Sequence, residues 1–367
     1  MRVGTFAVTL LMLCGMAGAA FGTTYLGGPY TITTPTDQNG SEFIIGTTAA
    51  TTNVLTVDGV DPNTGALYNL GTGGITVTTT NAGRYGKLVV TGAYAVVGST
   101  TSDGAAPANA DRRQMRVTRG AGSTGVVEIS NGGTIYAGQT TLGQAAGTTL
   151  VTVSGGLFDI YQPNATSTSN ALTVNNGALY TQTGGTLNVF GQTANHGALI
   201  QGNSTMDIQG GTVVIERCLV VGSGGTAGTF RVTGSSADIT ANAVTLGGVD
   251  VSLLSFVLND ASGVSCIKSY GVASTGGTID LSGYTPLAAM TLDLLRDGDG
   301  DIGTVGDLGV VLGAGVTQYI AGVQAGWTLH TNAQGDTLQA TYTLVPEPAT
   351  MALLGMGLLG VMYRRRR

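Results

Sequence analysis

Apolar and polar residues alternate at a fixed distance after pairs of small residues between Thr124 and Gly248. The first members of four glycine pairs are 23, 29 and 26 residues apart, and a worn copy follows after 25 more. The pairs begin at Gly132, Gly155, Gly184 and Gly210, and the worn copy is Ser235-Ser236. Apolar residues stand three and five positions after each first glycine, namely Ile135/Ala137, Phe158/Ile160, Leu187/Val189 and Val213/Ile215. Because alternate side chains of a strand point to opposite faces, each copy turns the same face inward.

A repeat of ~20–29 residues with short strands is typical of a β-solenoid. The chain is therefore predicted to be all-β, a single-stranded parallel β-helix with N- and C-terminal caps. A right-handed path is expected from the usual chirality of parallel crossovers. Glycine makes up 61 of 367 residues and charged residues only 10%, but the 42% hydrophobic content is enough to bury a core.

The phased rungs are expected to occupy residues 121–285, because Gly276-Gly277 is again followed in phase by Ile279 and Leu281. Residues 23–120 are expected to form an N-terminal cap and irregular rungs. Within them Gly73-Gly74 is followed by apolar residues one position out of phase, and a one-residue slip exchanges inside for outside. That copy is thus bulged or differently built.

Residues 286–345 are expected to form a C-terminal β cap. Two alternating segments, Trp327–Leu329 and Leu338–Leu344, predict a hairpin around Asn332–Asp336, with Trp327 as its packing anchor. Repeat proteins need atypical ends of this kind because a terminal repeat lacks one neighbour.

Residues 1–22 have the pattern of a secretory signal peptide. Arg2 precedes the apolar run Val3–Met16, and Ala17-Gly18-Ala19 fits the small-x-small cleavage rule. A retained membrane anchor is the less favoured alternative, because the apolar run is short. Between Thr23 and Val345 the chain has 10 basic and 20 acidic residues, which argues against a nucleic-acid partner.

The last residues, 346–367, form a segment of a different kind. Pro346-Glu347-Pro348 precedes the apolar stretch Ala349–Met362, and four arginines end the chain. Fourteen residues of helix reach only ~21 Å, short for a ~30 Å hydrocarbon core. The terminal arginines are expected to stay cytoplasmic, with the body of the protein outside.

This ending resembles the PEP-CTERM sorting signal of Gram-negative envelope and exopolysaccharide systems. The matching residues are Pro346, Glu347 and Pro348 and the basic end Arg364, Arg365, Arg366 and Arg367. The resemblance implies recognition by an exosortase in the inner membrane, removal of the tail, and delivery to the cell surface or biofilm matrix. The glycine-pair copies also resemble autotransporter passengers and pectate-lyase-like β-helices, a likeness that indicates a fold and not an activity.

One acidic segment is a candidate calcium site, because carboxylates at alternate positions can converge on a hard cation. Its residues are Asp297, Asp299, Asp301 and Asp307. A calcium loop that starts at Asp297 would have Ile302 where glycine is needed and Leu308 where the bidentate acid is needed. A solvated Asp-Gly turn is therefore the favoured interpretation and a loose Ca²⁺ site the alternative; no other cofactor is predicted.

No catalytic constellation is evident in the chain. His196 and His330 are the only histidines, and neither lies near a nucleophile motif. The rung carboxylates, at differing offsets from the glycine pairs, are Glu128, Asp159, Asp207, Glu216 and Asp238. Register is therefore not expected to bring two of them to the ~5–10 Å that glycosidase chemistry needs.

Two smaller groups leave alternatives open. Four arginines in Asp111–Arg119 are interpreted as a solvated loop, or otherwise as an anion or acidic-glycan contact. Cys218 and Cys266 lie 48 residues apart and are interpreted as two buried thiols, although a disulfide is possible in an exported protein.

The sequence thus predicts a non-enzymatic, exported structural or adhesive protein that contacts exopolysaccharide. It would be anchored in the inner membrane only until its tail is removed. A polysaccharide lyase or hydrolase on the same scaffold is the alternative, and a calcium-dependent glycan-binding module that uses Asp297–Asp307 is a weaker third hypothesis.

Overall fold

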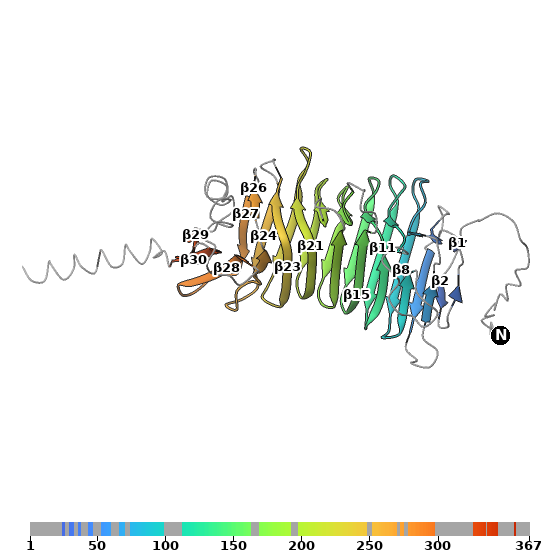
Figure 1. Cartoon of the computed structure of the whole chain (residues 1–367), viewed down its shortest axis with the longest axis horizontal. Coiled ribbons are helices and arrows are strands. Elements are labelled where there is room, and N and C mark those ends of the chain that lie inside the picture. Colours follow the sequence, from blue (N-terminus) through green and yellow to red (C-terminus); the bar gives the residue numbers. More distant parts are fainter. Residues whose placement is uncertain are drawn as a thin grey trace, which may run out of the picture.

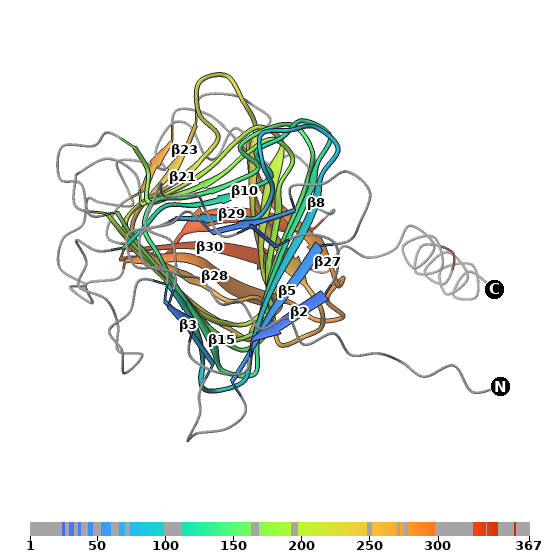
Figure 2. The same cartoon turned by 90° about the vertical axis from the view of Figure 1, so that its right-hand side faces the viewer.

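The computed structural model describes residues 24–25, 29–32, 36–37, 43–46, 53–59, 66–69, 74–98, 112–162, 169–191, 197–247, 252–269, 272–274, 278–297, 326–334, 336–343 and 356. These residues form an all-β parallel solenoid, as predicted. Its strands stack along one long axis, from the N-terminal end in blue to the C-terminal end in orange and red (Figure 1). Seen along that axis, the strands make three walls around a common core (Figure 2).

The first wall is a separate sheet of ten parallel strands, in which each strand pairs with the next one listed. Its strands are β2 (Pro29–Ile32), β5 (Asn53–Asp58), β8 (Tyr85–Thr91), β11 (Thr124–Ser130), β14 (Thr148–Val153), β17 (Leu179–Gln182), β20 (Ser204–Ile208), β22 (Gly228–Thr233), β24 (Leu253–Leu258) and β27 (Thr278–Gly283).

The second and third walls belong to one larger sheet, because two long strands continue from one wall into the other. These strands are β21 (Gly211–Val221) and β23 (Ala237–Leu246), and their register shifts between Ile215 and Cys218. The other strands of the second wall are β3 (Thr36–Asp37), β6 (Ala66–Asn69), β9 (Ala95–Gly98), β12 (Gly133–Ala137), β15 (Gly156–Gln162), β18 (Thr186–Gly191), β25 (Ile267–Ser269) and β28 (Met290–Asp297). Those of the third wall are β1 (Thr24–Tyr25), β4 (Phe43–Ile45), β7 (Ile75–Thr76), β10 (Met115–Val117), β13 (Thr140–Leu142), β16 (Leu172–Val174), β19 (Ala198–Ile200) and β26 (Val272–Ser274).

The predicted inward faces are confirmed. Ile135, Phe158, Leu187 and Val213 pair in succession along the second wall, and each is 0% exposed. The apolar columns of the three walls meet in one continuous core that runs the length of the solenoid. Burial of these side chains is the main favourable contribution to folding, at ~25 cal/mol for each Å² of apolar surface removed from water.

The glycine pairs mark sharp corners between the walls. Gly211 has a φ of 81°, and a Cβ atom there would lie 2.4 Å from the carbonyl oxygen of Gly185 in the preceding rung. Only glycine, which has no Cβ atom, adopts a positive φ at low cost and also fits so close to a neighbouring backbone. The corner thus allows each rung to pack directly on the one before it.

Three sequence assignments need correction. Gly211 pairs with Ala237, so the worn copy aligns one residue later than Ser235-Ser236. Ile279 is buried as predicted, but it pairs with Leu254 in the first wall and not in the second. The strand after Gly73-Gly74 is β7 of the third wall, which explains why this copy is out of phase with the others.

The N-terminal part of the chain contributes regular rungs. β5 and β8 pair in register in the first wall, where Leu55 lies beside Leu88 and both are fully buried. The described strands up to residue 98 thus extend the same walls.

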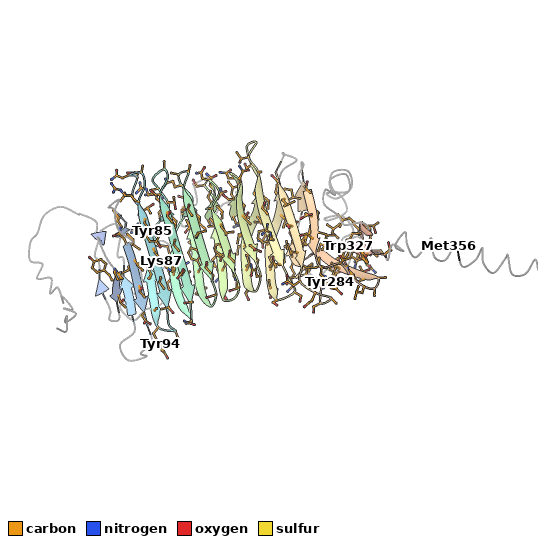
Figure 3. All side chains as sticks on the ribbon, turned by 180° about the vertical axis from the view of Figure 1, so that it is seen from behind. Tyr85, Lys87, Tyr94, Tyr284, Trp327 and Met356 are labelled. Carbon is orange, nitrogen blue, oxygen red and sulfur yellow. The ribbon has the colours of Figure 1, made fainter. Side chains whose placement is uncertain are left out.

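The C-terminal hairpin is present. β29 (Trp327–Thr331) and β30 (Thr337–Tyr342) pair antiparallel, and β30 also pairs antiparallel with β28. The rings of Trp327 and Tyr342 lie 5.3 Å apart, and Trp327 is buried at the end of the solenoid (Figure 3). The last edge of the second wall is therefore covered by a strand of opposite direction.

Candidate functional site

An ion pair is buried on the outer side of the second wall. Arg112, which precedes β10, places its Nη2 atom 2.9 Å from Oδ2 of Asp159 in β15. Its Nη1 atom also donates a hydrogen bond to the Asp159 carbonyl oxygen at 3.3 Å. The guanidinium lies 5.4 Å and 5.6 Å from the ring centroids of Tyr136 and Tyr161. The two charged side chains are only 6% and 10% exposed.

This arrangement links the segment before β10 to the next two rungs, through Tyr136 in β12 and through Asp159 and Tyr161 in β15. Burial of two charges is costly, and here the close contact and the two tyrosine rings offset that cost. Burial and the neighbouring Asp159 charge raise the pKa of Tyr136, while Arg112 opposes that shift. These charged and aromatic groups contact mainly one another, although Arg112 Nε and Asp159 Oδ1 are buried without a hydrogen-bond partner. Their mutual contacts favour a structural role.

The alternative of an anion contact at the arginine cluster is accordingly weakened. Arg112 is committed to Asp159, and Arg116 donates a hydrogen bond to Gln114. Arg119 also has an interaction partner, so at least three of the four arginines already have partners within the protein.

Three carboxylates share one outward column of the first wall. Glu128 is followed in register by two threonines and then by Asp207. Asp280 lies three strands beyond Asp207, after Arg231 and Ser255. Because neighbouring strands are ~4.8 Å apart, consecutive carboxylates in this column are separated by ~14 Å.

The remaining rung carboxylates lie elsewhere. Asp159 pairs with Asn188 in the second wall, and Asp238 occupies a neighbouring column, where its Oδ1 lies 2.8 Å from Nζ of Lys268. Glu216 is exposed at the register shift of β21.

The acidic segment lies mostly outside the described residues. Asp297 ends β28, whereas Asp299, Asp301 and Asp307 are not among the residues that the structure describes. Within the described part of the chain, no group of three or more His, Cys, Asp or Glu side chains could hold a metal ion. The calcium site stays a prediction.

Neither histidine nor cysteine forms a recognisable reactive centre in the described residues. His330 lies in the cap hairpin, with Nε2 2.7 Å from Oγ1 of Thr341, and His196 lies outside the described residues. Cys218 and Cys266 are free thiols, not a disulfide. Burial raises the pKa of Cys266 to about 12, so its thiol is neutral at physiological pH.

The sorting residues Pro346, Glu347, Pro348 and Arg364–Arg367 lie beyond the last described strand. The described residues contain no helix that is long and apolar enough to cross a membrane. Comparison of the sequence with known proteins found no similar curated protein and no similar solved structure. One family description matches, the PEP-CTERM protein-sorting motif, over residues 344–367. The chain thus carries a PEP-CTERM sorting motif behind a β-solenoid, and the motif implies recognition by an exosortase-type enzyme and export to the cell surface.

Proposed function

We propose that this protein is a structural or adhesive component of the cell envelope or extracellular matrix that contacts exopolysaccharide. The observation that carries the proposal is the combination of a C-terminal sorting motif with one continuous parallel solenoid. The motif supplies the route to the cell surface. The solenoid supplies a stiff body, because its rungs share one core along the whole axis.

The outer face of the first wall supports contact with glycans. Many of its outward positions carry hydroxyl groups, among them Thr56, Thr91, Thr152, Thr181, Thr205 and Thr229. A hydroxyl group can both donate and accept hydrogen bonds, which matches the hydroxyl groups of sugars. Thr152 and Thr181 are neighbours in one column and Thr205 and Thr229 in another, so hydroxyl groups follow one another along the axis there.

The carboxylate geometry favours binding over cleavage. Glycoside hydrolysis needs two carboxyl groups about 5–10 Å apart. Glu128, Asp207 and Asp280 follow one another at ~14 Å in their shared column, which is too far for such a pair. A role in holding a polymer is consistent with this spacing.

The test is fractionation of the host, with mass spectrometry of the protein's C-terminus. We expect a trimmed tail at the surface of the wild type and an intact tail in a strain that lacks the exosortase. A Glu347→Ala variant is expected to keep its tail in the wild-type host. Glu216→Ala, which changes an exposed carboxylate of the body, serves as the matched control and is expected to be trimmed normally. An intact Arg364–Arg367 end in the wild type would contradict the proposal.

A further inference from the structure

Charged and polar side chains form a column on the first wall that the spacing of residues in the sequence does not indicate. It consists of Asp207, Arg231, Ser255 and Asp280, which occupy the same outward position in β20, β22, β24 and β27. Four consecutive strands span ~14 Å along the axis. The column, which we call the polar column, is thus long enough for several sugar residues.

One end of the polar column is fixed by hydrogen bonds. Asp207 accepts a hydrogen bond from Thr233 Oγ1 at 2.9 Å and another from Gln209 Nε2 at 3.0 Å. Its side chain is 11% exposed, whereas that of Arg231 is 41% exposed and lies 3.9 Å away. Asp207 is therefore held in place, and the guanidinium beside it keeps donors that face solvent.

The other end is held by Ser255, which donates a hydrogen bond to Asp280 Oδ2 at 3.4 Å. Ser255 is only 2% exposed, although it occupies an outward position between Arg231 and Asp280. Burial raises the pKa of Asp280, while the Ser255 hydrogen bond and the charge of Arg231 oppose that shift. Arg231 thus interacts with the carboxylates on both sides of it.

The charge of the polar column limits which ligand it can bind. Two carboxylates surround one guanidinium, and the body has 20 acidic and only 10 basic residues between Thr23 and Val345. This excess of negative charge repels an acidic polymer. A neutral polymer is not repelled, and its hydroxyl groups can donate to the carboxylates and accept from the guanidinium.

We propose that the polar column binds a neutral, hydroxyl-rich polysaccharide aligned with the axis of the solenoid. This inference rests on the proposed function, because it identifies the region and the glycan class through which that function would act. The exposed guanidinium of Arg231 offers donors, and Asp280 offers an acceptor two strands further along, so a chain that lies along the column can bond to more than one rung.

The experiment uses the host's own exopolysaccharide, separated by anion exchange into neutral and acidic pools. Binding of the purified protein to each pool is measured by affinity electrophoresis. We expect the wild type to bind the neutral pool, and Arg231→Gln and Asp280→Asn to bind it at least tenfold more weakly. Lys87→Gln is the matched control, because Lys87 forms a 2.7 Å ion pair with Glu128 on the same wall but lies outside the polar column. It is expected to bind like the wild type.

The outcomes separate the two proposals. Unchanged binding by Arg231→Gln and Asp280→Asn, or binding to the acidic pool alone, would overturn the role of the polar column. If the wild type bound neither pool, the exopolysaccharide contact itself would be contradicted. Circular dichroism of each variant shows whether its fold is retained, and either of the two column variants suffices for the test.

Discussion

Breaking the ion pair between Arg112 and Asp159 should cost much of the stability of this solenoid. Loss of one partner from a buried ion pair typically lowers the free energy of unfolding by ~3–5 kcal/mol. In Asp159→Leu the hydrogen bond from Arg112 to the backbone carbonyl and the contacts with Tyr136 and Tyr161 can persist. We therefore expect a loss at the lower end, about 3 kcal/mol.

Substitution of the other partner, Arg112→Leu, should lower the free energy of unfolding by at least as much. Arg112→Leu leaves the Asp159 carboxylate buried without its cation, and Oδ1 of that carboxylate already has no hydrogen-bond partner. The double variant removes both charges, so its loss should be smaller than the sum of the two single losses. Because the two groups are in contact, we expect a coupling free energy of about 2 kcal/mol.

Urea unfolding followed by far-UV circular dichroism and by tryptophan fluorescence measures these losses. Trp327 is the only tryptophan and lies in the C-terminal hairpin, so agreement of the two signals indicates cooperative unfolding. The control is Glu128→Gln, which breaks an ion pair with side chains 25% and 40% exposed. Its loss should stay below about 1 kcal/mol. A loss below ~1 kcal/mol in Asp159→Leu, or strictly additive losses, would refute the reasoning.

Three further predictions concern the corners, the core and the thiols. Gly211→Ala should lower the free energy of unfolding by more than ~2 kcal/mol, because it adds a close contact to an unfavourable φ, whereas Gly224→Ala, with the same sign of φ and open space, should cost about 1 kcal/mol in the same urea assay. Phe158→Ala should cost ~3–5 kcal/mol, measured as a lower urea midpoint, because its fully buried ring leaves a cavity; a loss under ~1 kcal/mol would contradict its core position. Cys266 should be alkylated by iodoacetamide far more slowly than free cysteine at pH 8, because its raised pKa keeps the thiol neutral. Its own rate, followed by mass spectrometry, should be higher at pH 10 than at pH 8. A rate at pH 8 equal to that of free cysteine would contradict this.

The spacing of apolar residues was enough to predict the fold and the inward side chains, because every rung repeats the same face at a fixed offset. It was not enough to assign each strand to a wall. A glycine pair indicates a sharp turn but not which one, and a three-walled rung turns at more than one corner. Ile279 therefore showed the expected phase, although it belongs to the first wall.

The sorting motif could be found from sequence because its residues are contiguous. The Arg112–Asp159 pair could not, since its members lie 47 residues apart and meet only once the strand register is known. The polar column could not be found from the sequence for the same reason. Asp207 is one of the rung carboxylates found from the sequence, whereas Arg231 and Asp280 come into register with it only through the pairing of β20, β22, β24 and β27.

Pairing in the first wall also determines the order in which the protein can acquire its structure. Each strand there pairs only with the strands one rung before and after it. A rung thus needs no downstream residue in order to add to those already formed, and the chain can fold progressively as it emerges from a membrane channel N-terminus first. The last described strand, β30, ends at Tyr342, just ahead of the motif at residues 344–367. Removal of the motif would therefore leave every described strand in place.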